Sequence, residues 1–335
     1  MKRIGKYVKA FSTPPVVAAF ASSVGKTEGE GPLCQWFDVV NPDDGVGCGT
    51  WEHAEAQLVK QAVERAAEKG GVPVSSISIA FAGDLLNQCT ASTFGLKDAG
   101  IPVAGLFGAC STFALALALS AASVDAGFAE KALAVSSSHF CSAEKQFRYP
   151  LEYGGQRTPT AQRTVTGAGA AIVDVSLKGV KITHGMIGRI TDYGVCDMSN
   201  MGAAMAPAAA RTIADFMDDT GMKPADFDMI LTGDLGSVGS KLMRELILSE
   251  RGYDLGGVHA DCGNMIFDAK KQDVHAGGSG CGCSASVLCG PVFSDIAAGR
   301  LKKVLFAGTG ALMSPLTALQ GDPIPAVAHA VLLCS

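Results

Sequence analysis

The sequence has few charged and few aromatic residues, and each shortage excludes a class of protein. Charged residues make up 18% and aromatic residues 7% of the 335 positions. Lys and Arg form no block along the chain and the formal net charge is −5, so nothing electrostatic favours nucleic-acid binding. Disorder needs low hydrophobicity, whereas 48% of this chain is apolar. The composition predicts a folded protein that does not bind nucleic acid.

A signal-peptide core, a membrane span and a disulfide framework are also missing from the pattern. The apolar run at residues 16–21 is too short for a signal peptide. Residues 99–124 carry no charge, but Pro102 and several glycines interrupt them, and the part after Cys110 is shorter than the ~20 residues of a spanning helix. We expect a buried helix there instead. The 11 scattered cysteines favour free thiols in a reducing compartment.

The chain contains an internal repeat. Residues 77–85 read ISIAFAGDL and residues 227–235 read FDMILTGDL, and each follows a helix-like segment, 51–69 or 205–220. Glycine turns at 108–111 and 280–284 then open apolar helices that reach 125 and 297, and an apolar strand follows each. The pattern predicts two similar α/β halves, residues 1–175 and 176–335, with mostly parallel strands and helices on both faces of the sheet.

Several long strings resemble one family. They are GEGPL (29–33), FAGDLLNQ (81–88), GLFGACST (105–112), SSSHF (136–140), EKQFRYPLEYGGQRTPTAQRTVTGAGAA (144–171) and HAGGSGCGCSA (275–285). The turn at Cys110 is similar to that of the thiolase-like superfamily, and the strings resemble its stage V sporulation protein AD family over nearly the whole chain. The resemblance implies the five-layered αβαβα thiolase fold. It also implies binding of dipicolinic acid (pyridine-2,6-dicarboxylic acid) for uptake into the developing spore.

The same resemblance implies partners and a location. Membrane channel proteins encoded in the same sporulation operon are the expected partners. Through them the protein would sit on the spore inner membrane from the cytoplasm of the forespore. Superfamily analogy further implies a homodimer built by edge strands of the two first halves. No cofactor is implied, although Ca²⁺ could enter together with dipicolinic acid.

Cys110 and His275 are the sharpest candidate positions. Cys110 follows a Gly-Ala turn at a predicted helix start, where backbone N–H groups and the helix dipole stabilise anions and lower a thiol pKa. It is therefore a candidate nucleophile or pocket floor, and the alternative is a small residue where the halves pack. His275 lies in a string similar to the thiolase turn whose His activates the Cys, but one residue shorter. A purely structural role for this His stays open.

The rest of a condensing site is incomplete. Thiolase-like enzymes carry a further His or Asn where this chain has Thr232, Gly233 and Asp234, and the Gly-rich string from Phe306 lacks the second Cys of biosynthetic thiolases. Carbanion chemistry needs a base and an oxyanion hole at defined positions. Non-catalytic ligand binding is therefore favoured. The alternatives are an acyltransferase or thioesterase that uses Cys110 and His275, and a structural subunit with a degenerate pocket.

Further polar residues follow predicted strands. Asp84 and Asp234 end equivalent strands, where they could accept a ligand proton, orient a histidine or help hold Ca²⁺. The alternative is that they are turn carboxylates with none of these roles. Ser136 and His139 form a polar lip after another strand, with turn chemistry as the alternative. Three arginines in a Gly-, Thr- and Tyr-rich stretch, each a candidate carboxylate ligand or a solvated surface residue, are Arg148, Arg157 and Arg163.

Cysteines near His275 suggest a metal site only superficially. The spacing of Cys281, Cys283 and Cys289 lacks the paired C-x2-C of structural zinc sites, so we expect small core residues and no metal. The predicted pocket lies at the seam of the halves, floored by Cys110 and flanked by Asp84, His139 and His275. The predicted ligand-binding set is Asp84, Cys110, Ser136, His139, Asp234, His275 and Cys283.

Overall fold

The computed structural model describes residues 1–147, 157–176 and 178–335. Its strands are β1 (Lys2–Ile4), β2 (Val8–Ala10), β3 (Val16–Val24), β4 (Val39–Val40), β5 (Ile79–Gly83), β6 (Val103–Gly105), β7 (Ala132–Ser138), β8 (Arg163–Thr164), β9 (Gly167–Asp174), β10 (Val180–Met186), β11 (Met229–Thr232), β12 (His259–Asp261), β13 (Gly278–Ser279), β14 (Lys303–Ala311) and β15 (Ala326–Cys334). Its helices are α1 (Lys26–Gly29), α2 (Trp51–Gly70), α3 (Thr90–Leu96), α4 (Thr112–Asp125), α5 (Phe140–Phe147), α6 (Met201–Thr220), α7 (Gly236–Arg251), α8 (Cys262–Met265), α9 (Cys281–Val287), α10 (Phe293–Ala297) and α11 (Pro315–Leu319).

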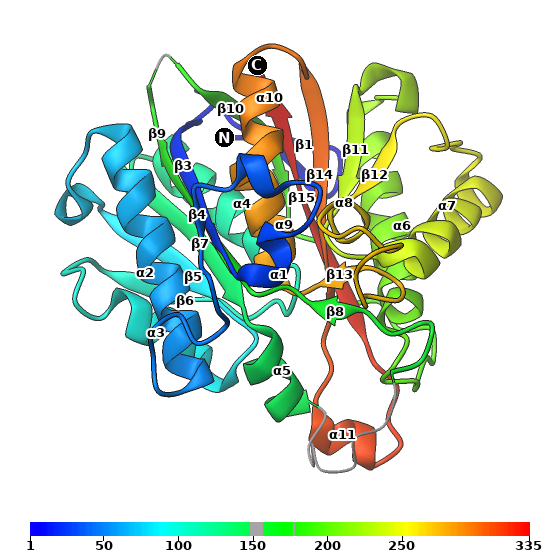
Figure 1. Ribbon diagram of the computed structural model, residues 1–335. Coiled ribbons are helices and arrows are strands. Elements are labelled where there is room, and N and C mark those ends of the chain that lie inside the picture. The colour runs from blue at the N-terminus through cyan, green and yellow to red at the C-terminus, as the bar shows by residue number, and fades with distance from the viewer. Residues whose placement is uncertain (148–156, 177) are drawn as a thin grey trace.

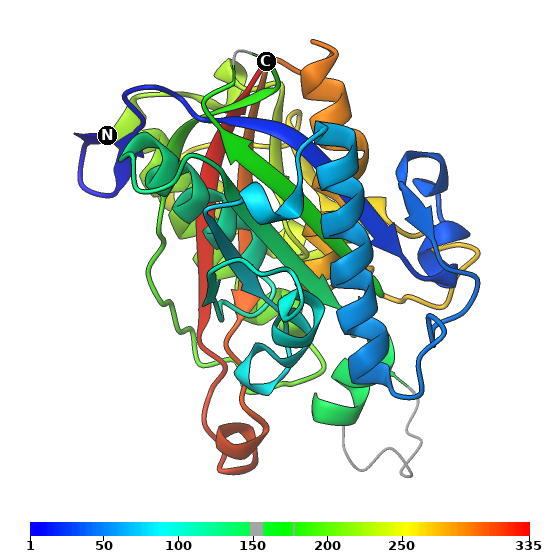
Figure 2. The ribbon, with the colours of Figure 1, turned by 90° about the vertical axis from the view of Figure 1, so that its left-hand side faces the viewer.

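Two half-sheets and three layers of helices build the fold (Figure 1). Helices α4 and α9 lie in the middle, in a core that they share with strands of both half-sheets. Helix α2 covers the outer face of the first half-sheet, ordered β6-β5-β7-β9-β3, as Figure 2 shows. Helices α6 and α7 cover the outer face of the second, ordered β12-β11-β14-β15-β10. The predicted αβαβα layering is thus confirmed.

Local signals explain where the long helices begin and end. The Thr50 side chain caps α2 by accepting a hydrogen bond from the His53 N–H, and Gly71 ends this helix in the left-handed conformation. Gly221 ends α6 in the same way. Helix α4 is apolar all round because strands of both half-sheets surround it, which explains the uncharged stretch before Val124. Within residues 1–147, 157–176 and 178–335, no helix has the length and apolar character to cross a bilayer.

The predicted repeat is visible in the strand order. Strand β5 lies one strand in from the edge of the first half-sheet and is followed by β7 and β9. Strand β11 has the same position in the second half-sheet and is followed by β14 and β15. The prediction of mostly parallel strands is wrong, because β9 and β15 run antiparallel to their neighbours. Strands β14 and β15 are consecutive, and an antiparallel pair needs no helical crossover between its strands.

The second central helix is shorter than predicted. The segment expected to be one helix from 280 to 297 consists of α9, a π-helical turn at Leu288–Val292 and α10. Pro291 lies inside that turn. Proline has no N–H to donate and its ring clashes with the carbonyl four residues earlier, so the regular α-helical ladder breaks here.

The two halves are joined by backbone pairing. Strand β10 pairs with β3 through Val180 opposite Val17, so the half-sheets form one continuous sheet. Strand β2 also pairs with β10, so the first ten residues lie on the second half although the predicted boundary puts them in the first. The boundary at residue 175 itself stays a prediction.

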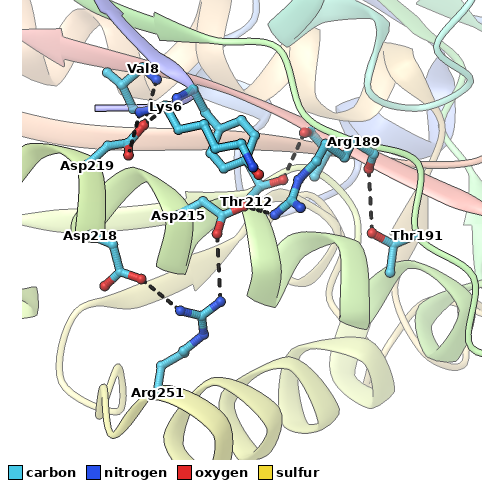
Figure 3. Close-up of polar contacts among 11 residues, drawn as sticks. Lys6, Val8, Arg189, Thr191, Thr212, Asp215, Asp218, Asp219 and Arg251 are labelled. Carbon is cyan, nitrogen blue, oxygen red and sulfur yellow. Dashed lines mark hydrogen bonds and ion pairs between the residues drawn. The ribbon is translucent and has the colours of Figure 1, made fainter. Parts of the chain in front are cut away.

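Helix α6 anchors this N-terminal segment (Figure 3). The Asp219 carboxylate accepts hydrogen bonds from the backbone N–H groups of Lys6 and Val8, each at 2.9 Å. Arg251 of α7 contacts Asp215 and Asp218 on α6, at 3.8 Å and 2.9 Å. These contacts fasten the chain start and α7 to the outer helix of the second half.

Candidate functional site

Cys110 lies in a tight turn between β6 and α4. Ala109 has a φ of 48°, in the left-handed region that a β-carbon disfavours. The Ser111 N–H donates to the Gly108 carbonyl at 3.0 Å, and the Thr112 N–H donates to the Ala109 carbonyl at 3.2 Å. Two of the amides on which an anion site at this helix start would depend are therefore already paired within the turn.

Three segments of the second half converge on the Cys110 thiol. Ser279 Oγ lies 3.9 Å from Cys110 Sγ and donates to the Asp234 carboxylate at 2.9 Å. The same carboxylate accepts from the Gly280 N–H at 2.9 Å and from the Thr309 hydroxyl at 2.7 Å. The structure thus brings together two predicted site residues, Cys110 and Asp234.

The electrostatics of this pair differ from the sequence prediction. Burial raises the pKa of the Cys110 thiol well above its ordinary value, and the Asp234 carboxylate raises it further. Burial also raises the pKa of Asp234. The prediction that the helix start lowers the thiol pKa is therefore wrong, because lost hydration and a nearby negative charge outweigh a partial dipole charge.

A cavity of about 480 Å³ opens beside Cys110 at the seam of the halves. Most of its lining is apolar: Leu85, Phe107, Ala109, Ala143, Phe147, Ala161, Met198, Met201, Ala311, Met313 and Leu319. The rest is polar or bears a thiol: Cys110, Glu144, Arg157, Thr158, Gln162, Thr164, Ser199 and Ser279. Residues from both halves contribute, so the cavity needs the complete fold. An apolar slot with a few polar groups is typical of a small-molecule site.

Arg157 provides the cationic group of the lining. Its side chain is 12% exposed, and its Nη2 donates to the Asp273 carbonyl at 2.6 Å and pairs with the Asp273 carboxylate at 3.0 Å. Its Nη1 is buried without a hydrogen-bond partner. Arg163 instead stacks on Phe140, with its guanidinium carbon 4.0 Å from the ring centroid. Arg148 lies outside the described residues.

Gln162 lines the cavity and was not identified from the sequence. Its side-chain nitrogen donates to the carbonyls of Asp234 and Gly278, both at 2.7 Å. Two carbonyl acceptors fix the orientation of the amide, and its oxygen is left buried without a partner. Nothing in the sequence around Gln162 marks it, because its partners lie more than 70 residues away in the chain.

The structure gives Asp84, Ser136 and His139 other partners, and none of them lines the cavity. Asp84 accepts from the Leu86 N–H at 2.9 Å and from Ser92, holding the loop after β5. Ser136 Oγ donates to the Cys281 carbonyl at 3.0 Å. His139 Nε2 lies 2.7 Å from the Asp44 carbonyl, and burial lowers the pKa of this imidazole.

His275 and Cys283 are also placed away from the lining. His275 Nε2 contacts the Asp273 carboxylate at 3.1 Å, and its φ is 49°. Its imidazole is thus held by Asp273. Cys283 is fully buried on α9 in the central core. Within the described parts of the chain, no three His, Cys, Asp or Glu side chains are grouped to hold a metal ion.

Solved structures share this fold at low sequence identity. The 3-oxoacyl-[acyl-carrier-protein] synthase III of Aquifex aeolicus VF5 is 13% identical, with a TM-score of 0.56 over 97% of this chain and 100% of that one. Cerulenin-bound OleA from Xanthomonas campestris is 14% identical, with a TM-score of 0.59 over 96% of this chain and 100% of that one. These likenesses show the thiolase-like fold of condensing enzymes.

Sequence comparison is more specific than fold comparison. The family model described as stage V sporulation protein AD matches residues 5–334. The curated stage V sporulation protein AD of Bacillus subtilis (strain 168) is 43% identical over 331 residues, which are 99% of this chain and 97% of that protein. Because both matches run almost from end to end, the chain belongs to the stage V sporulation protein AD family and has a role in sporulation.

Proposed function

We propose that this chain binds dipicolinic acid in the cavity beside Cys110 and that it catalyses no condensation. One observation carries the proposal: a cavity of about 480 Å³ with mainly apolar walls has one guanidinium, that of Arg157, among the described residues that line it. A planar aromatic ring suits the apolar walls. Arg suits a carboxylate, because its fork of N–H donors matches the two carboxylate oxygens.

The surroundings of the thiol support binding over catalysis. A nucleophilic Cys needs a thiolate, whereas burial and Asp234 raise the pKa of Cys110. A condensing enzyme also needs a base near the thiol, and His275 contacts Asp273 instead. Asp234 lies on the loop where thiolase-like enzymes carry a His or Asn. Its carboxylate accepts hydrogen bonds, whereas such an enzyme needs a hydrogen-bond donor at this place.

An acyltransferase or thioesterase is the second candidate. It is favoured by the fold, which matches condensing enzymes, and by the position of Cys110 on the cavity wall. The two candidates differ in what the cavity should accept: a small aromatic dicarboxylate, or an acyl chain attached through a thioester.

Calorimetric titration of the purified protein tests the proposal. Dipicolinic acid, added with and without Ca²⁺, should bind at one site per chain. Cys110→Ala should retain binding, because Arg157 and the apolar walls remain. Acetoacetyl-CoA and malonyl-CoA should not be turned over. Turnover that disappears in Cys110→Ser, together with no heat from dipicolinic acid, would favour the enzyme.

We also propose the partners and the location that the family resemblance implies. The protein would act from the forespore cytoplasm, held at the spore inner membrane by channel proteins of the same sporulation operon. It would form a homodimer through β6, the edge strand of the first half-sheet, whose Val103 side chain is 45% exposed. Fractionation of sporulating cells with and without the channel proteins tests the location: loss of the membrane fraction without them is expected.

A further inference from the structure

Cations gather at the end of the molecule that lies away from the cavity. The hairpin of β1 and β2 carries Lys2, Arg3, Lys6 and Lys9 and no acidic residue, although the whole chain has a net charge of −5. Three of these residues are exposed, and Lys9 is half-buried. The N-terminus lies at the top of Figure 1, whereas α11, which contributes Leu319 to the cavity lining, lies at the bottom. The basic hairpin is therefore separate from the ligand site.

Two further segments meet the start of this hairpin. The Met1 amine pairs with the Asp125 carboxylate at 2.6 Å, so the chain start lies beside the loop of residues 126–131 that follows α4. Val175 lines a shallow depression of the surface together with residues of that loop, so the turn after β9 lies there as well. The cations that these two segments add are Lys131, Lys178 and Lys181.

The acidic side chains at this end are fewer, and the fold occupies two of them. The Asp125 side chain is 1% exposed and is paired with the Met1 amine. The Asp219 carboxylate accepts hydrogen bonds from the backbone N–H groups of three hairpin residues, 6, 7 and 8. Glu130 and Asp174 are the acidic residues within the three segments themselves. Cations outnumber anions here, so this surface has a positive potential on an acidic protein.

Apolar side chains protrude beside these cations. Phe128 is 73% exposed, Val175 is 61% exposed and Met1 is 50% exposed. A nucleic acid would satisfy the cations alone, because its phosphate backbone offers no apolar phase for such side chains. A bilayer with anionic lipids satisfies both, since its headgroups attract Lys and Arg and its interface accepts apolar side chains.

We propose that this surface, formed by the β1–β2 hairpin, the loop at 126–131 and the turn that contains Val175, binds directly to a membrane with anionic phospholipids. The inference rests on the membrane location proposed above and adds a lipid contact to it. A small surface of this kind binds weakly and reversibly, so the channel proteins are still needed to retain the protein on the membrane. The contact also turns the cavity away from the bilayer.

Vesicle binding by the purified full chain tests the proposal. Sedimentation should show at least about tenfold stronger binding to phosphatidylcholine vesicles with about 30% phosphatidylglycerol than to pure phosphatidylcholine vesicles. Raising the salt from about 0.05 M to about 0.5 M should weaken this binding by about tenfold or more, because screening shortens the range of the attraction. Absent binding, or equal binding to both vesicles, would overturn the proposal. Because these vesicles hold no channel protein, the result is independent of the cell fractionation.

A charge variant tests which surface is used. The combined variant Lys2→Gln, Arg3→Gln, Lys6→Gln and Lys9→Gln should bind anionic vesicles about 100-fold or more weakly than the parent. Its contacts to Asp219 use backbone N–H groups, so the hairpin should stay in place, and thermal unfolding checks this. The matched control changes the net charge equally at four exposed lysines elsewhere, by Lys60→Gln, Lys97→Gln, Lys241→Gln and Lys270→Gln. Equal losses in both variants would overturn the assignment of this surface.

Tryptophan fluorescence tests the apolar contact. The emission of Phe128→Trp should shift to shorter wavelength when anionic vesicles are added, because the indole enters the interface. Leu316→Trp, at a 67% exposed position on α11, is the matched control and should not shift. A shift in Leu316→Trp alone would place the membrane contact at the cavity end. A parent protein that binds a short DNA duplex as tightly as anionic vesicles, with no shift in Phe128→Trp, would show a nucleic-acid surface instead.

Discussion

One hydroxyl group connects the carboxyl group of Asp234 to the thiol of Cys110: Ser279 Oγ donates to Asp234 at 2.9 Å and lies 3.9 Å from Cys110 Sγ. The Asp234 carboxylate raises the pKa of that thiol. Cys110 lies in the turn just before the central helix of the first half, whereas Asp234 follows a strand of the second. Ser279 and Thr309 donate hydrogen bonds to Asp234 and fix its carboxylate in this place. The seam between the halves therefore favours the protonated form of this thiol.

This arrangement predicts a slow thiol. Iodoacetamide at pH 7.5 should alkylate Cys110 at least about tenfold more slowly than the exposed Cys34, because only the thiolate reacts. Asp234→Asn removes the negative charge and should speed the labelling of Cys110 without changing that of Cys34. Mass spectrometry of the labelled peptides measures both rates in one sample. Faster labelling of Cys110 than of Cys34 in the parent protein would contradict this account.

Bulk in the cavity should abolish ligand binding. Ala143 on α5 is buried and lines the cavity, so Ala143→Leu should occupy ligand space and weaken dipicolinic acid binding by about 30-fold or more. Ala297→Leu, on an exposed helical turn, is the control for the added side chain. Calorimetry measures binding, and thermal unfolding shows whether the variant is folded. Unchanged affinity in a folded Ala143→Leu protein would place the site elsewhere.

Glu28 should make a contribution to the stability of the fold that falls as the pH rises from 5 to about 7. Burial raises the pKa of Glu28 to about 7, so the native state holds a proton that the unfolded chain releases above a pKa of about 4.3. The contribution of Glu28 to the free energy of unfolding therefore decreases between about pH 4.3 and pH 7 and levels off above pH 7. The Glu28→Gln variant should lack this component. As the pH rises from 5 to 8, its free energy of unfolding should therefore gain about 1–3 kcal/mol relative to that of the parent.

Urea unfolding at several pH values measures this effect. Glu130→Gln is the control, because Glu130 is exposed. A parent and a Glu28→Gln variant that lose stability in parallel across the window would show that Glu28 is ionised in the folded protein.

The proposed dimer makes a prediction about mass. Val103→Lys places a charge on the free edge of β6, and edge lysines oppose strand pairing between chains. Light scattering should show a dimer for the parent and a 34.3 kDa species for the variant at micromolar concentration. Phe128→Lys, at another exposed apolar position (73%), should remain dimeric. A monomeric parent would remove the dimer from the proposal.

The sequence by itself determined the repeat and the long helices, and its resemblance to one family implied the five layers. Apolar periodicity, glycine stops and uncharged stretches are local, so α2, α6, α4 and the strands beside them were predicted within a few residues. Long strings shared with one family determined the membership. The broken helix at Pro291 and the antiparallel β15 were missed because each depends on which neighbour a segment finds.

Only the tertiary structure decided where polar side chains point. Asp84, His139 and His275 occupy the predicted loops, yet each is held by a nearby group of its own: Ser92, the Asp44 carbonyl and Asp273. The side-chain amide of Gln162 is held at the site by hydrogen bonds to backbone carbonyls 72 and 116 residues away in the chain. Burial reversed the expected shift in the pKa of Cys110, and burial depends on the packing of the whole chain rather than on the type of one residue. A side chain's partner and its hydration are properties of the packed chain, so the sequence could name Cys110 but could not say what surrounds it.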